Sequence, residues 1–326
     1  MPRTLQRNLL TKAKISKKDE FYTQLTDIES ELRHYKNHFR GKVVFCNCDD
    51  PRRSNFFKYF SDNFEALGLK KLITMSYKHA DNDHFNNQNP EAAVFLEYEG
   101  DRNGNSVPDP HEIGIVPLNG DGDFRSEESI ELLQQADIVV TNPPFSLFRK
   151  YVEQLIKYDK KFLIIGNVNA ITYKEIFALI KENKAWLGIN LGRGISGFIV
   201  PQHYELYGTE TKIDSLGNRI VSPNNCLWLT NLDTSKRHED IILSKMYYGN
   251  ESAYPKYDNF DGINVNKTKD IPKDYNGYMG VPITFLHKFN PDQFEIVKFR
   301  KGDDDKDLSI NGKCPYFRIL IKNKRL

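Results

Sequence analysis

The sequence predicts an α/β protein with a doubly wound, mostly parallel sheet, followed by a C-terminal domain of irregular structure. Short apolar runs alternate with segments of amphipathic helical spacing through the first two thirds of the chain. Polar, turn-rich loops follow several of these runs, as they do at the carboxyl ends of parallel strands. After about Asp233 the alternation stops, and short aromatic segments rich in Asn and Lys take its place.

The first elements are a strand, a helix and a second strand. KVVFCNC (Lys42 to Cys48) predicts a buried strand, and Ser54 is placed to cap a helix in NFFKYFSDNFEAL. KKLITMSY predicts the next strand. The polar, Asn-rich stretch from Lys78 to Pro110 predicts a long excursion or a small hairpin on the surface.

The alternation then continues to about Asp233. Helices are expected in SEESIELLQQ, from Ser146 to about Tyr158 and in TYKEIFALIKENK, and strands in ADIVVT and KFLIIGNVN. GFIVPQHY and NNCLWLTNL are separated by a turn-rich polar insert. We expect these two runs to form a terminal antiparallel pair.

Composition indicates a globular protein of one large or two ordinary domains. The 326 residues are 39% hydrophobic and 12% aromatic, which is enough for a core. The four cysteines include no Cys-x-x-Cys pair and the eight histidines show no ligand spacing, so we expect free thiols, a cytoplasmic location and no metal. No apolar run approaches the roughly 20 residues of a membrane helix, so we expect no membrane partner.

Two consecutive prolines, Pro143 and Pro144, separate ADIVVT from the following helix. Proline lacks an amide hydrogen and pushes the preceding residue out of the helical region, so the helix cannot begin before Phe145. The loop that remains offers free carbonyls, the Asn142 side chain and the ring of Phe145. A rigid connection between strand and helix is the simpler alternative.

Two other loops are expected at the same edge of the sheet, because ligands of doubly wound sheets bind outside the carboxyl ends of the strands. CNCDDP contributes Asn47, Asp49 and Asp50, and GDGDF contributes Asp123 and Phe124. For GDGDF the alternative is an Asp turn in which Gly120 and Gly122 supply positive φ.

Such a crevice can activate an amino group on an aromatic ring. Nitrogen N6 of adenine is a poor nucleophile because its lone pair is delocalised, but the Asn142 oxygen and the Pro143 carbonyl can accept its two hydrogens while Phe145 stacks on the base. Preorganised groups of this kind contribute ~10²- to 10³-fold each. In a duplex the base must first be rotated out. Phe198 is a candidate for the opposite wall, with a core position as the alternative.

Charge is unevenly distributed, although the net charge is only +2. The first 18 residues carry six basic side chains and no acidic one: Arg3, Arg7, Lys12, Lys14, Lys17 and Lys18. A basic end on an otherwise balanced chain predicts contact with a polyanion, most readily nucleic acid. The alternative is a solvated tail. In the C-terminal region Asn266 and Lys267, with Asn264, Asn276 and Asn311, are candidate readers of base edges.

Segments in chain order resemble the EcoRI-type adenine-specific DNA methyltransferases over nearly the whole chain. They are KAKISKKDEFYTQ, FCNCDDPR, SNFFKYF, NGDGDFRS, IVVTNPPFSLFRKY, SPNNCLWLTNL, YNGYMGVPITFLHKFNP and CPYFRILIKNKR. The resemblance implies a Rossmann-like methyltransferase sheet, S-adenosylmethionine as cofactor, and transfer of methyl to a flipped-out adenine in GAATTC of double-stranded DNA. It also implies a type II restriction-modification enzyme of the bacterial cytoplasm, monomeric and without direct contact with the restriction enzyme.

The resemblance further assigns roles and domains. Tyr22 and Thr23 are expected to touch the cofactor, Asp123 and Phe124 its adenine, and the segment Asn142 to Phe145 the target base. The expected domains are a basic arm at 1–18, a catalytic domain at 19–233 and a target-recognition domain at 234–326.

One loop departs from the wider adenine methyltransferase pattern, which is glycine-rich after the first strand. The chain has the glycine-free segment Asp50 to Asn55 instead, so it stays open which of Asn47, Asp49 and Asp50 meets the cofactor's ammonium. Two alternatives also remain, a methyltransferase of RNA or of a protein amide and a DNA-binding protein with an inactive cofactor site. The basic arm favours duplex DNA over RNA or a protein amide as substrate. Measuring the binding of S-adenosylmethionine would distinguish an active methyltransferase from a DNA-binding protein with an inactive cofactor site.

Overall fold

The computed structural model describes residues 21–77, 93–101, 104, 108, 113–190, 195–200, 211–222 and 225–326. The chain divides into two compact units, of which the first comprises Met1–Ile171 and Gly188–Leu232 and the second Thr172–Leu187 and Asp233–Leu326. The segment 172–187, which the sequence pattern groups with the catalytic domain, thus belongs to the second unit. The basic arm at 1–18 lies outside the described residues.

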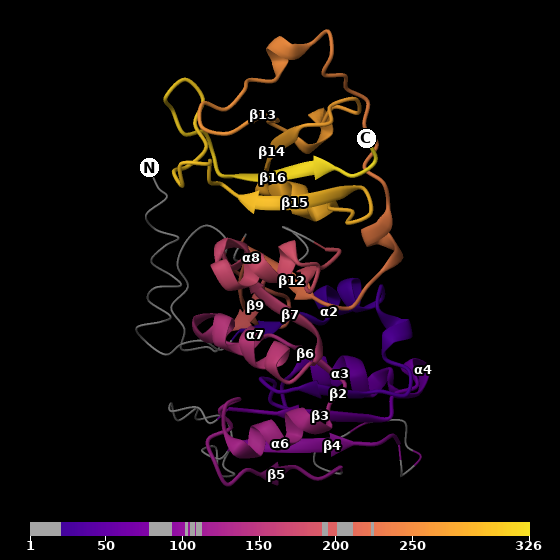
Figure 1. Ribbon diagram of the computed structural model, residues 1–326. Coiled ribbons are helices and arrows are strands. Elements are labelled where there is room, and N and C mark those ends of the chain that lie inside the picture. The colour runs from indigo at the N-terminus through magenta and orange to yellow at the C-terminus, as the bar shows by residue number, and fades with distance from the viewer. Residues whose placement is uncertain are drawn as a thin grey trace. The chain divides into compact units, whose positions relative to one another are not determined.

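The first unit contains a large sheet with a parallel centre (Figure 1). The central strands follow the spatial order β3 (Lys71–Met75), β2 (Val43–Cys46), β6 (Ile138–Thr141) and β7 (Lys161–Asn167). Antiparallel strands flank this centre: β4 (Val94–Tyr98) and β5 (Val116–Pro117) beyond β3, and β12 (Cys226–Thr230) beyond β7. The predicted α/β class is confirmed, with β2, β3, β6 and β7 close to their predicted positions.

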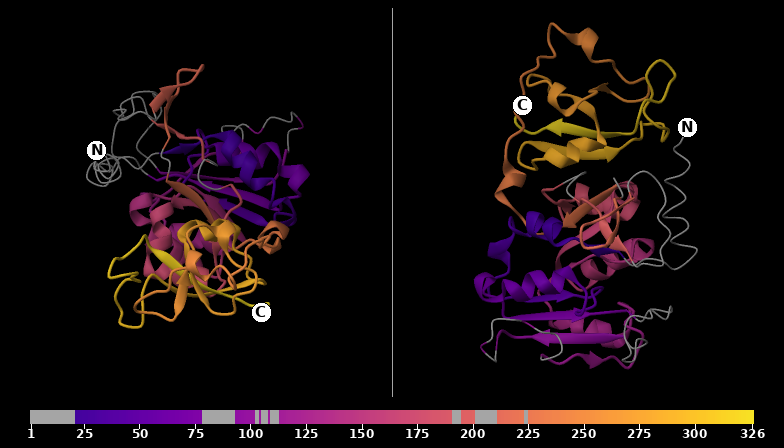
Figure 2. Two further views of the ribbon diagram at one scale, coloured as in Figure 1. Left: turned by 90° about the horizontal axis from the view of Figure 1, so that it is seen from above. Right: turned by 180° about the vertical axis from the view of Figure 1, so that it is seen from behind.

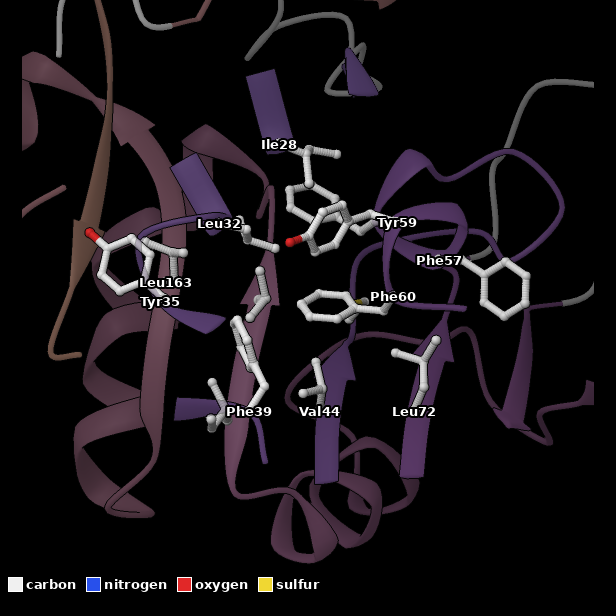
Figure 3. Packing of buried hydrophobic residues seen from close by; sticks show 14 of the residues in the cluster. Ile28, Leu32, Tyr35, Phe39, Val44, Phe57, Tyr59, Phe60, Leu72 and Leu163 are labelled. Atoms are coloured by element: carbon white, nitrogen blue, oxygen red, sulfur yellow. The ribbon is translucent and has the colours of Figure 1, made fainter. Parts of the chain in front are cut away.

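Helices cover both faces of this sheet, because alternate residues of a strand point to opposite faces. The helices of one face are α2 (Leu25–Leu32), α3 (Asn55–Asp62) and α4 (Phe64–Leu67), and those of the other are α6 (Glu127–Gln135) and α7 (Phe148–Lys157). On the first face Phe39 and Phe60 lie over Val44 of β2 (Figure 3). On the second, the Phe148 ring occupies the space where a Cβ on Gly166 would be.

Side-chain caps define where two of these helices begin. The Ser54 hydroxyl accepts from the backbone amides of Phe56 and Phe57, which confirms the predicted cap of α3. The Ser126 hydroxyl accepts from the amide of Ser129 at the start of α6. The predicted long helix after Ser54 is interrupted at Asn63, so that α3 and α4 are separate.

Two expectations about strands in the first unit are wrong. The stretch 78–110 is not only a surface excursion, since its residues 94–98 form β4 within the large sheet. GFIVPQHY and NNCLWLTNL do not pair with each other, because β12 pairs with β7. Periodicity indicates a strand but does not choose its neighbour, and here the neighbour lies in a different sheet.

That second sheet of the first unit has the order β1-β9-β11-β10. Its strands are β1 (Tyr22–Thr23), β9 (Phe198–Val200), β11 (Arg219–Val221) and β10 (Thr211–Ile213). Thr23 pairs with Phe198 in antiparallel register. The sheet therefore joins the segment Phe21 to Thr23, called FYT below, to the strand that carries Phe198.

The second unit contains a four-stranded sheet, so the prediction of an irregular C-terminal domain is wrong. The strands follow the order β13 (Gly262–Asn264), β14 (Tyr278–Pro282), β16 (Arg318–Asn323) and β15 (Phe294–Phe299), with β16 in yellow in Figure 2. The helix α8 (Lys174–Lys181) packs on β15, with the ring centroids of Phe177 and Phe299 5.1 Å apart. The strands are short and separated by polar loops, which hides their periodicity in the sequence.

Short elements complete the described chain. These are β8 (Trp186–Leu187) and the 3₁₀ helices η1 (Lys36–His38), η2 (Phe145–Leu147), η3 (Val168–Thr172), η4 (Ser235–His238), η5 (Glu251–Ala253), η6 (Thr268–Asp270) and η7 (Ile283–Lys288). In the part of the chain that the structure describes, no helix has the length and apolar character needed to span a membrane.

Candidate active site at the carboxyl edge of the parallel strands

The NPPF loop links β6 to η2 and holds the Asn142 carboxamide in one orientation. Asn142 Nδ2 donates to the carbonyl of Phe21 at 2.7 Å. Asn142 Oδ1 is buried and meets no hydrogen-bond donor among the described residues. Leaving a buried acceptor without a donor costs about 1–3 kcal/mol. The loop therefore presents an oriented acceptor that a bound amino group would satisfy.

Three phenylalanine rings lie beside this carboxamide. The Phe145 ring stacks on Phe21 with centroids 5.9 Å apart, and Phe198 lies 5.7 Å from Phe21 and 6.1 Å from Phe145. Phe198 is fully buried, whereas Phe21 and Phe145 are half-buried. Phe198 is thus the buried ring against which the other two pack. The family resemblance assigns roles to Tyr22 and Thr23 but none to Phe21, the first residue of the FYT segment.

Asp49 is a buried carboxylate held by hydroxyl groups. It accepts from Thr141 Oγ1 at 2.5 Å and from Ser54 Oγ at 2.9 Å. Burial raises the pKa of Asp49 to about 7, against the two hydroxyl hydrogen bonds, which favour the charged form. No basic side chain among the described residues forms an ion pair with it. Thr141, the residue before NPPF, thus ties that loop to CNCDDP.

The two neighbouring candidates of this loop have other partners. Asn47 Oδ1 accepts from the hydroxyl of Tyr151 on α7. Asp50 accepts from Arg52 through Nε at 2.8 Å and Nη2 at 2.6 Å. Of the three candidates for the cofactor's ammonium, Asp49 is thus the buried carboxylate without a cationic partner in the described chain.

Tyr151 also connects CNCDDP with the GDGDF loop. The Phe124 ring is buried and packs edge-on against Tyr151, with centroids 5.1 Å apart. Asp123 accepts from the Arg125 guanidinium, which lowers the pKa of this carboxyl group. Tyr151 was missed from the sequence because a tyrosine on the apolar face of a helix reads as a core residue.

The turn in GDGDF depends on one glycine. Gly122 has φ +75°, as the alternative of an Asp turn requires, whereas Gly120 does not have positive φ. A Cβ on Gly122 would also lie 2.2 Å from the carbonyl oxygen of Ser76. Both features exclude a side chain at this position.

We expect Gly122→Ala to lower the free energy of unfolding by more than about 1 kcal/mol, because it combines positive φ with a backbone collision. Urea unfolding measures the change. Gly217→Ala is the matched control, since Gly217 has φ +82° with nothing within 4 Å of its Cβ position. Equal losses in the two variants would show that the contact with Ser76 contributes nothing.

The FYT segment lies next to two of the loops. Asn55 Nδ2, at the start of α3, donates to the carbonyl of Thr23 at 2.8 Å. Thr23 Oγ1 is buried and has no hydrogen-bond partner among the described residues. The same segment carries Phe21, the anchor of Asn142. Hydrogen bonds therefore join FYT to NPPF and to the start of α3, and join Thr141, just before NPPF, to CNCDDP. Tyr151 connects CNCDDP to GDGDF through a hydrogen bond and ring packing.

The remaining candidates lie away from these loops in the sequence. Asn266 and Lys267 are exposed and follow β13 in the second unit. The basic residues of the arm fall outside the described residues. Across the described ranges, no group of three or more His, Cys, Asp or Glu side chains could hold a metal ion.

Comparisons with known proteins cover the whole chain. A family model described as adenine-specific methyltransferase EcoRI matches residues 9–324. The chain is 68% identical to type II methyltransferase M.EcoRI of Escherichia coli, over 100% of this chain and 99% of that protein. Two mycoplasma proteins are also similar: M.MgeORF184P of Mycoplasma genitalium is 38% identical over 97% of this chain and 98% of its own, and M.MpnI of Mycoplasma pneumoniae 37% over 96% and 98%. No solved structure matches the chain significantly.

Proposed function

This chain belongs to the EcoRI family of adenine-specific methyltransferases, and we propose that it transfers a methyl group to N6 of an adenine within GAATTC of double-stranded DNA. It is an adenine-specific type II methyltransferase, and its similarity to three type II methyltransferases supports a role in restriction-modification. The observation that carries the proposed site is the oriented, buried Oδ1 of Asn142.

In this proposal Asn142 and Pro143 hold the target amino group. The Phe21 carbonyl fixes the carboxamide so that Oδ1 accepts one N6 hydrogen, and the Pro143 carbonyl accepts the other. With both hydrogens held, the nitrogen lone pair leaves conjugation with the ring and becomes nucleophilic. Phe145 stacks on the base and is itself supported by Phe21 and Phe198.

S-adenosylmethionine supplies a methyl group activated by its sulfonium centre, and the residues beside NPPF fit this cofactor. Asp49 is a buried carboxylate with no cationic partner among the described residues, and it would hold the cofactor's ammonium group. The hydroxyl of Thr23, which has no hydrogen-bond partner among the described residues, offers a second polar contact. Asp123 would accept from the adenine amino group, and Phe124 would line the adenine site. The Rossmann-like type of methyltransferase sheet is part of the same proposal and rests on the parallel centre β3-β2-β6-β7.

If Asp49 holds this charge, affinity for S-adenosylmethionine should rise with pH up to about pH 7. Burial keeps the carboxyl group protonated below its pKa of about 7, and a bound cation favours the ionised form. As the pH rises toward about 7, the dissociation constant should fall by up to about tenfold per pH unit. The fall should end at about pH 7, before the cofactor's own α-amino group loses its charge at about pH 8.

Calorimetric titration between about pH 5.5 and about pH 7.5 measures this dependence. Asp49→Asn should bind more weakly and lose the dependence, whereas Asp50→Asn, at the neighbouring carboxylate that pairs with Arg52, should keep it. An unchanged pH slope in Asp49→Asn would assign the ionisation to another group.

The DNA-binding part of the proposal rests on charge and on access to the target atom. N6 cannot be reached inside a duplex, so the adenine must be rotated into the site. The basic arm at 1–18 would neutralise phosphates, and the region 234–326, with Asn266 and Lys267, would recognise the sequence. We propose a monomer that acts on DNA in the cytoplasm and does not contact the restriction enzyme.

Product analysis tests the function directly. Incubation with labelled S-adenosylmethionine and plasmid DNA should place the label on adenine N6 and protect GAATTC sites, but not other sites, from a panel of restriction nucleases. Label in RNA or protein alone, in cytosine, or at unrelated DNA sequences would contradict the proposal. Failure to bind the cofactor would favour a DNA-binding protein with an inactive site.

A further inference from the structure

A buried arginine in the second unit orients two asparagine side chains at the end of β13, Asn264 in its last position and Asn266 two residues later. Arg318, at the start of β16, is 5% exposed. Its Nε donates to Asn264 Oδ1 at 2.9 Å and its Nη2 to Asn266 Oδ1 at 3.3 Å. Its Nη1 donates to the carbonyl of Tyr316 at 3.2 Å. Among the described residues no carboxylate pairs with this guanidinium.

Both carboxamide oxygens of this network are fully used. Asn264 Oδ1 also accepts from the Tyr257 hydroxyl at 3.0 Å, and Asn264 Nδ2 donates to Asn266 Oδ1 at 2.9 Å. A carboxamide oxygen has two lone pairs, and each of these two oxygens has two donors. Since an arginine can only donate, the oxygens rather than the NH₂ groups must face it. The orientation of both carboxamides is thereby fixed.

Asn266 is exposed to solvent, unlike Asn264 and Arg318. Its oxygen is used within the protein, and its Nδ2 donates to no described residue. An asparagine that reads adenine needs both its oxygen and its nitrogen. Asn266 can offer a base edge only hydrogen-bond donors.

We propose that Asn266 reads guanine in the major groove of the target DNA, as a donor whose polarity Arg318 and Asn264 set. Guanine is the base that presents two acceptors, N7 and O6, on this edge, whereas adenine places a donor at position 6. This inference rests on the proposed function, because it requires DNA as substrate and a guanine in the recognised sequence. Arg318 and Asn264 are positioning residues, and Asn266 determines specificity.

Asn266→Asp tests the polarity with almost no change in shape. One carboxylate oxygen can still accept from Asn264 and Arg318, so the network is kept. The other oxygen replaces the outward NH₂ group and turns a donor into an acceptor. Asn250→Asp, at an exposed asparagine of the same unit, is the control for added negative charge.

Equilibrium binding is measured with four duplexes: one with GAATTC, one in which 7-deazaguanine removes N7, one in which 2,6-diaminopurine paired with thymine turns O6 into a donor, and one without the site. The wild type and Asn250→Asp should each lose at least about 5-fold in affinity on either modified site, the lower end of the usual value of a base contact. Asn266→Asp should bind GAATTC at least about 10-fold more weakly than the wild type and should no longer prefer guanine to diaminopurine.

Two results would overturn the inference. A preference for guanine over diaminopurine that is the same in Asn266→Asp and the wild type would show that Asn266 does not face this edge. Equal losses on DNA with and without GAATTC would indicate a phosphate contact instead. If the wild type itself binds DNA with and without GAATTC equally, the proposed function fails. That result differs from both results above, which overturn only the inference on Asn266.

Discussion

Asn142→Ala should lower the single-turnover rate of methyl transfer by at least about 10²-fold, the usual effect of removing one preorganised polar group. The variant loses the oriented Oδ1 while the prolines and the stack of Phe145 on Phe21 remain. Binding of DNA and of the cofactor should therefore change little. The rate is measured with both saturating, so that only the chemical step is compared.

Asn142→Asp is the matched variant, because it keeps an acceptor of the same length. It also loses the Nδ2 donor and sets an oxygen against the Phe21 carbonyl, which Asn142 contacts at 2.7 Å. We therefore expect an activity between those of the wild type and Asn142→Ala. A wild-type rate in Asn142→Ala would refute the acceptor role and leave NPPF as a rigid turn.

Glu31→Ala should lower the free energy of unfolding by about 3–5 kcal/mol, the usual cost of breaking a buried charged network. Glu31 is fully buried, with 0% of its surface exposed to water. It accepts from the Tyr35 hydroxyl at 2.9 Å and from the backbone amides of Ile189 and Asn190 at 2.7 Å each. Alanine leaves one buried donor, the Tyr35 hydroxyl, and two partly buried backbone amides without this acceptor.

Two variants on the same helix make this measurement specific. Glu31→Gln should lose less, because its amide keeps one acceptor but turns an NH₂ group toward backbone donors. Glu29→Ala, at an exposed position of α2, should change the free energy of unfolding by less than about 0.5 kcal/mol. Urea unfolding of all three provides the comparison. A loss in Glu31→Ala no larger than that in Glu29→Ala would refute the structural role.

The face of α2 that carries Glu31 also helps to position Phe198, one of the three phenylalanine rings of the site. Asp27, one turn before Glu31, accepts from the amide and hydroxyl of Ser196 at 2.9 and 3.0 Å. Ser196 lies two residues before Phe198, the ring that supports Phe145. A carboxylate of α2 thus fixes the approach to β9, so loosening this face should also lower activity.

Local sequence accounts for the framework of the first unit. Continuous apolar runs predict β2, β3, β6 and β7 because strands covered on both faces exclude polar residues. Ser54 and the prolines of NPPF mark helix starts through local backbone chemistry. The neighbours of β9 and β12, the place of β4 and the sheet of the second unit were not predictable in this way, because strand pairing joins residues far apart in sequence.

The candidate site divides along the same line. The sequence by itself determined which loops carry polar and aromatic side chains at the carboxyl edge of the strands, and its resemblance to one family determined the expected chemistry. Only the tertiary structure decided that Phe21 orients Asn142 from 121 positions away, that Thr141 binds Asp49 across 92 positions, and that Tyr151 joins two loops. Hydrogen-bond partners and burial exist only once distant segments meet. They leave Asn142 Oδ1 without a donor in the part of the chain that the structure describes, and burial raises the pKa of Asp49.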